Sequence, residues 1–519
     1  MGGNYEKGVY NQLQDVMLAF EKLTSEFAQF KIGQQWEIAR LKETHRQEIA
    51  GLKAAHEKEE RELQEKIARL GARIESLAVE NALLKARINK DSGNSGKPPS
   101  SDGFKRPENS REKSCRHAGG QPGHKGHAPK LSELPDEVID LNRSICECGG
   151  EIEYTKAPER RQRVDLRIYA HVTEYISGEG NCPCCGKYYP KQFPADLPGV
   201  INIGNKAKAV IALLLNEGAV SVNRTQRILR ELTEGRLDLS WASLLQYQEE
   251  LSEKLQPELD RIKQDLSLSE ILHKDESGVR INGILHWFHV TSTPRDTYYY
   301  VHPKRGSEAD IEIGILPGYN GVLVHDHLKS LYDFLCKHAE CNAHVLRYLK
   351  GVAENDPDYK PFAESLSALF KEMNETRKLL AWEGRTAFPR EKLGLFYRGF
   401  DEILAEWNAL TKAKEVQRRE KKQGSKYKSE AENLGKRLAE YKEQHLLFLT
   451  DFRVPFDNNQ AERDIRPAKT KLKVSGGFRS QSGAVAYARI RSFISTLRKR
   501  QHNIFFGLCS VFNGDPVLS

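Results

Sequence analysis

The sequence predicts an α+β multidomain protein, and three observations lead to this prediction. A heptad repeat runs through the N-terminal part, paired cysteine turns follow it, and strand-like runs alternate with helical ones after residue 266. A chain of 519 residues is long enough for three or four domains. We therefore expect a coiled-coil helix at 1–90, a basic arm at 91–130, a zinc-binding domain at 131–200, a helical region at 201–266, an α/β domain at 267–508 with a helical insertion at about 345–450, and a tail at 509–519.

Composition favours a soluble protein and argues against a membrane-spanning one. Charged residues make up 29% of the chain and hydrophobic residues 39%, as is usual for proteins with long helical surfaces. No apolar run approaches the roughly 20 residues that span a bilayer, and the first residues lack the apolar region of a signal peptide. We therefore expect a cytoplasmic protein. Five of the nine cysteines lie between Cys146 and Cys185, which in that compartment indicates metal binding rather than disulfides.

The N-terminal part has the pattern of a two-stranded coiled coil. Apolar residues recur in steps of four and three, with Leu at d positions and Ile at three a positions. Asn81 takes another a position, where a buried amide pair costs stability but fixes register and strand number. We expect a parallel homodimer; the alternative is one amphipathic helix packed on its own chain. The seam comprises Leu63, Ile67, Leu70, Ile74, Leu77, Asn81, Leu84 and Ile88.

Basic residues gather in two stretches, although the net charge is only +8. Residues 87–130 hold ten Lys or Arg against four Asp or Glu, and residues 466–500 hold ten against none. Two such stretches favour a polyanionic partner. The Ser-, Gly-, Pro- and Lys-rich segment 91–130 buries too little apolar surface to order by itself, so it is either a linker or an arm that follows DNA. Its candidate DNA contacts are Lys97, Lys105, Arg106, His124 and Lys125.

Two cysteine turns, each closed by glycine, predict a structural zinc site. Four thiolates at such turns are what a tetrahedral zinc ion requires. We expect the ligands Cys146, Cys148, Cys182 and Cys185. Only one residue separates the first pair, which is tighter than the common spacing, so Cys184 competes for one of the four positions.

Residues 206–266 have helical periodicity, and part of this region resembles a helix-turn-helix. A helix over 223–232, a turn at 233–236 and a second helix over 240–255 would form it. Ser240 supplies an N-cap oxygen for the second helix. The alternative is a helical spacer without DNA contact.

Three acidic residues are the candidate catalytic groups. Asp275 and Asp326 each end an apolar, strand-like run, and Glu462 lies in a helical segment. Two carboxylates on strand ends and one on a helix suit a site for two divalent cations that act on phosphodiesters. Mg²⁺ takes few protein carboxylates and keeps waters and substrate phosphates as its other ligands. Mn²⁺ is the expected substitute.

The order of elements around these acids predicts a sheet that brings two of them together. Runs at 286–290 and 297–301 have period-two patterning and predict strands. A short helix over 307–316 then precedes the strand that ends at Asp326. The stretch from Asp326 to Glu462 is too long for a simple connection, so we expect a helical insertion, with an exposed hairpin at 412–436.

The helix that carries Glu462 has its own expected features. Asp457 is the predicted N-cap, with Gln460 completing a capping box. We expect Gly476 and Gly477 to permit close approach of the backbone to a phosphate. The candidate DNA contacts here are Arg463, Arg466, Lys469, Lys471, Lys473 and Arg479.

Five blocks of sequence resemble the insertion sequence 66 family of bacterial DNA transposases. Their order and spacing carry the resemblance, which extends over nearly the whole chain. Ser277 stands where the family has Thr, and Asn342 where an aromatic residue is common. The blocks are Asn94–Asp102, Gly119–Gly126, Asp275–Ser277, Cys341–His344 and Asp457–Arg463.

The resemblance implies an RNase H-like catalytic domain of the DDE type, in which Asp275, Asp326 and Glu462 match the three acids. It implies a DNA transposase that binds terminal inverted repeats and joins them to target DNA at the nucleoid, and it leaves open whether accessory proteins take part. Two other functions compete: a non-catalytic, zinc-containing DNA-binding dimer, and an RNase H-like nuclease without strand transfer. Cys341 and His344 form either a metal-binding pair or an element near the DNA.

Overall fold

The structure is a computed structural model that describes residues 8, 11, 14, 16–18, 33–91, 93–95, 131–154, 156, 159–166, 168–420 and 429–518. The chain divides into two compact units, 1–89 and 90–519. Because the arrangement of the two units is not determined, each is described by itself.

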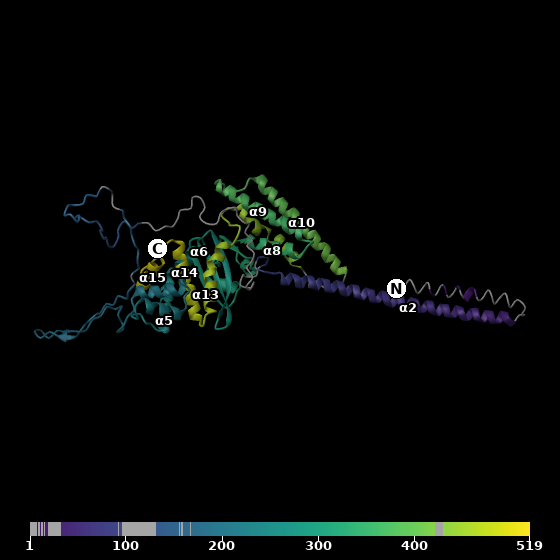
Figure 1. Ribbon diagram of the computed structural model, residues 1–519, viewed down its shortest axis with the longest axis horizontal. Coiled ribbons are helices and arrows are strands. Elements are labelled where there is room, and N and C mark those ends of the chain that lie inside the picture. Colours follow the sequence, from purple (N-terminus) through teal and green to yellow (C-terminus); the bar gives the residue numbers. More distant parts are fainter. Residues whose placement is uncertain are drawn as a thin grey trace. The chain divides into compact units, whose positions relative to one another are not determined.

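The first unit contains one long helix, α2 (Gly33–Ile88), as the heptad pattern predicts (Figure 1). The apolar side chains of the expected seam are exposed on this single helix, with Ile67 at 68% and Ile88 at 80% exposure. Exposed apolar side chains in this order are typical of a helix that has a partner. Pairing of two chains stays a prediction.

The expected zinc-binding segment contains little regular structure. Strands β1 (Gly180–Asn181) and β2 (Tyr188–Tyr189) form a two-stranded hairpin that holds the second cysteine turn. In the first turn, the amide of Gly149 donates to the carbonyl of Cys146, and Gly149 has a φ of 90°. In the second, Gly186 bonds to Cys182 in the same way at a φ of 70°. Glycine therefore closes each turn in the left-handed region, where other residues are strained.

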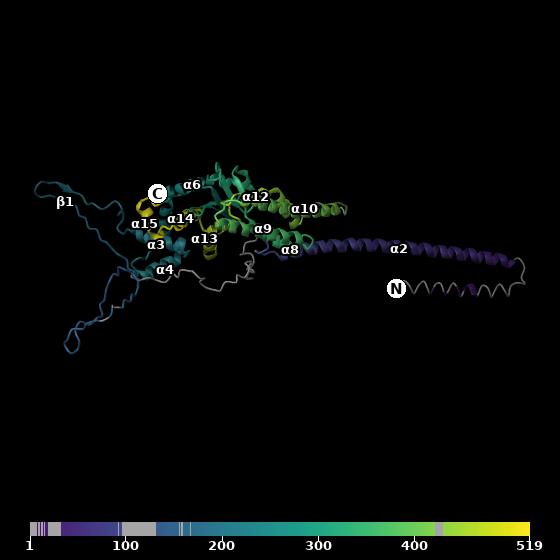
Figure 2. The same ribbon diagram turned by 90° about the horizontal axis from the view of Figure 1, so that it is seen from above.

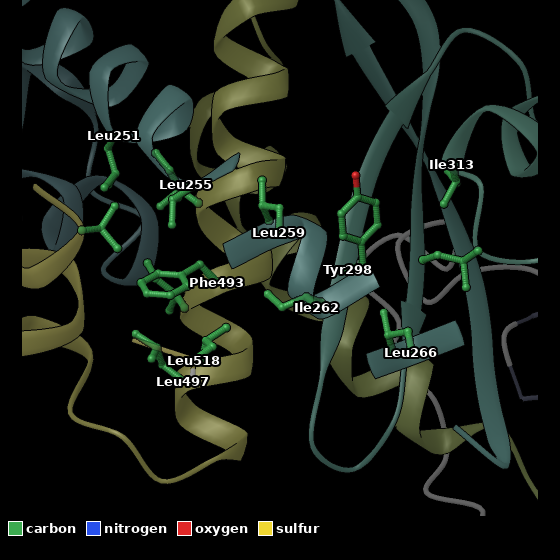
Figure 3. Close-up of a cluster of buried hydrophobic side chains, with 14 of the residues drawn as sticks. Leu251, Leu255, Leu259, Ile262, Leu266, Tyr298, Ile313, Phe493, Leu497 and Leu518 are labelled. Carbon is green, nitrogen blue, oxygen red and sulfur yellow. The ribbon is translucent and has the colours of Figure 1, made fainter. Parts of the chain in front are cut away.

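Helices precede the sheet and share its core. They are α3 (Asn205–Ala212), the π-helix η2 (Leu213–Glu217), α4 (Val222–Leu232), α5 (Trp241–Lys254) and α6 (Gln256–Ser267). The predicted N-cap is confirmed, since the Ser240 hydroxyl accepts from the Ser243 amide. Figure 3 shows Leu259 and Ile262 of α6 beside Phe493 of α14 (Gln481–Lys499) and Tyr298 of the sheet. The helical region is thus packed on the sheet through a common core.

A mixed five-stranded sheet forms the centre of the second unit, in the order β5-β4-β3-β6-β7. Strands β3 (Ile271–Ile281), β4 (Ile284–Ser292) and β5 (Thr297–His302) are antiparallel, while β6 (Val322–His325) and β7 (Lys337–Glu340) run parallel to β3. The turn Asn282-Gly283 joins β3 to β4 with positive φ at both residues, which suits the twist of a tight hairpin. The predicted order of three strands, a helix and a fourth strand is confirmed.

Helices cover both faces of this sheet. On one face, α13 (Asn459–Ser475) and α14 pack on Val279, Phe288 and Tyr299 through Ile465 and Tyr487. On the other face, α6 and α7 (Ser307–Ile313) pack on β3, β5 and β6. The 3-10 helix η3 (Lys329–Asp333) links β6 to β7.

The predicted helical insertion between Asp326 and Glu462 is confirmed. It consists of α8 (Asn342–Asn355), α9 (Lys360–Trp382), α10 (Arg390–Glu420), α11 (Glu430–Glu440) and α12 (Lys442–Thr450). Helices α9 and α10 lie side by side (Figures 1 and 2). The expectation of an exposed hairpin at 412–436 is wrong at Ala431 and Leu434, which are buried in a core that includes Trp407. Residues 421–428 of this hairpin lie outside the described residues.

The expected C-terminal tail is also wrong, because these residues belong to the core. Helix α15 (Ile504–Asn513) packs on α3, and Leu518 is only 2% exposed. The amides of Val517 and Leu518 donate to the carboxylate of Glu258 in α6. Apolar side chains in this segment and a buried acceptor opposite it hold the chain end in place.

Candidate active site

Two of the three predicted acids, Asp275 and Asp326, lie on the neighbouring strands β3 and β6. Asp326 directly follows β6, but Asp275 lies inside β3 (Ile271–Ile281), so the expectation that Asp275 ends a strand is wrong. In the parallel pair β3–β6, His273 is the partner of Val324, and the same register continued by two residues places Asp275 opposite Asp326. Side chains alternate between the faces of a strand, so both carboxylates lie on the face that α13 covers. The parallel pairing of β3 with β6 therefore brings the two acids to one face of the sheet.

The carboxylates of these acids repel one another, which raises pKa values. Burial and the neighbouring Glu276, together with Asp326, raise the pKa of Asp275 to about 8, against the opposing effect of Lys469. Burial also raises the pKa of Asp326, although Arg305 lowers it. Oδ1 of Asp326 is buried and has no hydrogen-bond partner. Like charges held this close, with an unpaired oxygen, are the environment that a divalent cation stabilises.

Glu276, a further acid beside Asp275, is buried, and no sequence pattern marks it as a site residue. It faces the opposite side of β3, where Arg305 donates to it through Nε at 2.7 Å and through Nη2. Burial and Asp326 raise the pKa of Glu276 to about 7, although Arg305 opposes them. Arg305 also lies 5.0 Å from the ring centre of Trp287. Arg305 is thus fixed beside the acids by two neighbours.

Lys274, the residue before Asp275 on β3, is buried as well. Its ammonium group bonds to Asp310 in α7, and both side chains are 1% exposed. This buried ion pair joins β3 to α7.

Glu462 lies in the first turn of α13 and faces a different set of neighbours. Its Oε1 is 3.9 Å from Nδ1 of His344 and 3.7 Å from Nη2 of Arg347. Cys341, His344 and Glu462 offer donor atoms within 4.8 Å of one another, the only such group of three among the described residues. The structure therefore brings Asp275 and Asp326 together and holds Glu462 beside Cys341 and His344.

Burial shifts the pKa values of His344 and Cys341, the two neighbours of Glu462, in opposite directions. It lowers the pKa of His344 to about 4, with Arg347 and Arg437 contributing, so the imidazole is neutral at pH 7. It raises the pKa of Cys341 to about 12.

The start of α13 differs from the prediction. Asn458, not Asp457, is the N-cap residue, and its side chain makes no capping bond, so the expected capping box is wrong. Asn458 instead connects elements: Nδ2 donates to the carbonyl of Lys274 at 2.7 Å, and Oδ1 lies 2.9 Å from Nδ1 of His273. Its amide donates to Sγ of Cys341 at 3.2 Å. No local pattern predicts such long-range bonds.

The expected role of Gly476 and Gly477 is also corrected. Gly476 ends α13 in the left-handed conformation, with a φ of 73°. At Gly477 a Cβ would lie 2.7 Å from the carbonyl oxygen of Arg280. The close approach that requires glycine is thus to strand β3 of the chain itself.

Five basic residues between Arg489 and Arg500 make internal ion pairs or hydrogen bonds. Arg491 and Arg498 pair with Glu217, Lys499 with Asp464, and Arg500 with Asp265 and Asp296. Arg489 donates to the carbonyl of Ser252. Four of these residues lie on α14 and Arg500 follows it. All five bind groups of the chain itself, although the side chain of Arg498 is 51% exposed.

The remaining cations of this stretch lie mainly on α13. Lys471 is an exception, because it donates to the carbonyl of Leu215 and burial lowers its pKa. The side chains of Arg466, Lys469, Lys473 and Arg479 are exposed, as is that of Arg463, which precedes the stretch. The predicted contacts of the arm, Lys97, Lys105, Arg106, His124 and Lys125, lie outside the described residues.

The two cysteine turns are formed separately. In the first, the amide of Gly150 and the thiol of Cys146 lower the pKa of Cys148. In the second, the amides of Cys185 and Cys184 lower the pKa of Cys182. The described cysteines of the two turns do not form a group of three within 4.8 Å. A shared zinc site, and the choice between Cys184 and its neighbours, stay predictions.

The sheet order, with Asp275 within β3 and Asp326 directly after the parallel strand β6, defines an α+β protein whose core is consistent with the RNase H-like class. The model of the family described as "Transposase IS66 family" matches residues 201–486, more than half of the chain, so the chain belongs to this family. The family implies transposase activity and DNA as the partner.

A second family model, of a family of unknown function (DUF6444), matches residues 33–130. No curated protein matches the chain. Within the described parts of the chain, each helix is too short or too polar to cross a bilayer.

Proposed function

We propose that this protein binds the terminal inverted repeats of an insertion sequence and catalyses metal-dependent DNA cleavage and strand transfer. The parallel register of β3 and β6, which sets Asp275 opposite Asp326 when it is continued by two residues beyond His273 and Val324, is the observation that supports the proposal most directly. Asp275, Asp326 and Glu462 are the proposed ligands of two Mg²⁺ or Mn²⁺ ions. When bound, such cations polarise the scissile phosphodiester and activate water, and later a DNA 3′-hydroxyl, for attack on phosphorus.

The residues of the chain have distinct parts in this proposal. Asp275 and Asp326 concentrate negative charge where the cations bind, and the buried, unpartnered oxygens of Asp326 and Glu462 fit that role. Asn458 fixes the helix of Glu462 against β3. Arg463, Arg466 and Lys469 expose their charges on the same helix and would hold the phosphates of the DNA backbone.

Three further assignments complete the proposed function. The basic residues of the arm at 91–130 contact DNA through its phosphates. Cys146, Cys148, Cys182 and Cys185 bind one structural zinc ion. The helix α2 pairs two chains in parallel, so that two catalytic domains act on two transposon ends.

Labelled insertion-sequence ends incubated with the protein, Mg²⁺ and target DNA test the function. A transposase yields cleaved ends and products in which those ends are joined to the target. Cleavage without joined products would instead support a nuclease. Binding without either product would support a non-catalytic DNA-binding dimer.

A further inference from the structure

A sulfur, a nitrogen and an oxygen donor meet where two helices begin. Cys341 is the N-cap of α8, His344 lies in the first turn of that helix, and Glu462 lies in the first turn of α13. Their donor atoms are within 4.8 Å of one another. The two-residue spacing between Cys341 and His344 places both side chains at one helix end.

Two of these donors are left without hydrogen bonds. Nδ1 of His344 and Oε1 of Glu462 are buried atoms without a hydrogen-bond partner, and they lie 3.9 Å apart. This separation is too long for a hydrogen bond. Two ligands of one tetrahedral cation with bonds of about 2.1 Å lie roughly 3.4 Å apart, so a small movement would let both bind one ion.

The third metal-ligating atom, Sγ of Cys341, already accepts a hydrogen bond, and it would keep this bond as a metal-bound thiolate. The amide of Asn458 donates to Sγ of Cys341 at 3.2 Å. The amide of Asn342 donates to the carbonyl of Phe456 at 3.1 Å, which ties the start of α8 to the segment before α13. The three donors therefore come from helix ends that are fixed to each other, and outer hydrogen bonds of this kind orient metal ligands.

The donor set selects the kind of cation. Thiolate and imidazole are ligands of zinc and other borderline or soft ions, whereas Mg²⁺ takes oxygen ligands. A thiolate and a carboxylate together carry the two negative charges that balance a divalent ion. Three protein ligands also leave a fourth position for water or a substrate oxygen.

We propose that Cys341, His344 and Glu462 bind one zinc ion, in a site that is separate from the cysteine turns. The site itself follows from the three donors; only its overlap with the Mg²⁺ ligands, through Glu462, rests on the proposed function. Zinc held there engages the carboxylate that the catalytic cations would otherwise share.

The zinc content of the full-length protein tests the proposal. Protein is saturated with zinc, freed of excess metal and assayed for zinc per chain by elemental analysis. Cys341→Ser, His344→Asn and Glu462→Gln are each expected to retain one zinc fewer than the unchanged protein. Cys509→Ser, which alters a buried cysteine in another core, is the matched control and is expected to lose none.

Cobalt loading gives a second measurement with the same variants. The absorption of a sulfur-to-cobalt charge-transfer band should fall in Cys341→Ser and stay unchanged in Cys509→Ser, while the cysteine turns contribute equally to both. If Cys341→Ser misfolds, His344→Asn, at a partly exposed position, still gives the zinc count. Equal zinc in the unchanged protein, Cys341→Ser and His344→Asn would overturn the proposal. Because zinc is counted without DNA, the result is independent of the strand-transfer assay.

Discussion

Asn458 donates a hydrogen bond from Nδ2 to the backbone carbonyl of Lys274, the residue before Asp275, at 2.7 Å. One side chain thereby fixes the start of α13, which carries Glu462, against the strand that carries the first acid. Its Oδ1 makes a second contact on the same strand, 2.9 Å from Nδ1 of His273. The positions of two acids that are distant in sequence therefore depend on one amide group.

Replacing Asn458 tests this connection. Asn458→Ala should lower the free energy of unfolding by about 1–3 kcal/mol, because buried partners on β3 lose their hydrogen bonds. It should also slow DNA cleavage more than it weakens DNA binding. Urea unfolding and a cleavage assay give both quantities. Asn459→Ala, which keeps the bonds of Asn458, is the control; equal effects of the two substitutions would contradict the assignment.

The three acids should each be required for cleavage. Asp275→Asn, Asp326→Asn and Glu462→Gln remove one charge with little change of shape, so cleavage should fall at least about 100-fold while DNA binding stays close to normal. Gel-shift and cleavage assays on the same DNA ends separate the two effects. Near-normal cleavage by any one variant would show that its residue is wrongly assigned.

Replacing two helical glycines, Gly435 and Gly394, with alanine should change the stability of the protein in opposite directions. In Gly435→Ala the new Cβ would lie 2.4 Å from Nε1 of the fully buried Trp407, so the core must shift, at a cost of about 1–3 kcal/mol. In Gly394→Ala the Cβ meets nothing within 4 Å, and removal of glycine from a helix should stabilise by up to about 1 kcal/mol. Thermal unfolding measures both changes, and a Gly435→Ala protein as stable as the original would contradict the close packing.

Glu217 should make stability depend on pH in acid. Burial acts to raise its pKa, but Arg491 and Arg498 outweigh burial, so the pKa is lowered. A lowered pKa means that the carboxylate contributes stability above its unfolded pKa of about 4.3, and that this contribution is lost as pH falls through the folded value. Glu217→Gln should therefore be less stable than the original at pH 7, with the difference shrinking below pH 4.

Urea unfolding at several pH values measures this difference. Glu253→Gln, at an exposed position of α5, should leave the pH dependence unchanged. A difference that grows as the pH falls would contradict the sign.

The helix α2 should associate in parallel pairs. Asn81→Ile should raise the thermal stability of the assembly and loosen its preference for two strands, because Asn81 pairs only with its counterpart in register. Deletion of residues 1–90 should weaken the pairing of DNA ends more than the binding of one end. Sedimentation of a 41–90 peptide checks the association; a monomer at high concentration would contradict it.

Much of the sheet was predictable because its signals are local. The apolar run that ends in Asp326 and the period-two strands before it predict the order of the strands. The continuation of β3 beyond Asp275 to Ile281 has no such signal. Other features depend on contacts between distant segments. The burial of Lys471 and the pairing of Arg491 arise from packing against the helices before the sheet, which a count of charges does not reveal. The hydrogen bonds of Asn458 and Arg305 also join segments that are distant in sequence, so no local pattern predicts them.

The buried pair Lys274–Asp310 constrains how this chain can vary over time. Either residue alone would leave an uncompensated charge inside the protein, at a cost of about 3–5 kcal/mol, whereas replacing both with apolar residues is often tolerated. We therefore expect the two positions to change together: a descendant that loses the lysine before Asp275 should lose its acidic partner in α7 too. Any path between the charged and the apolar pair passes through an intermediate that folds poorly.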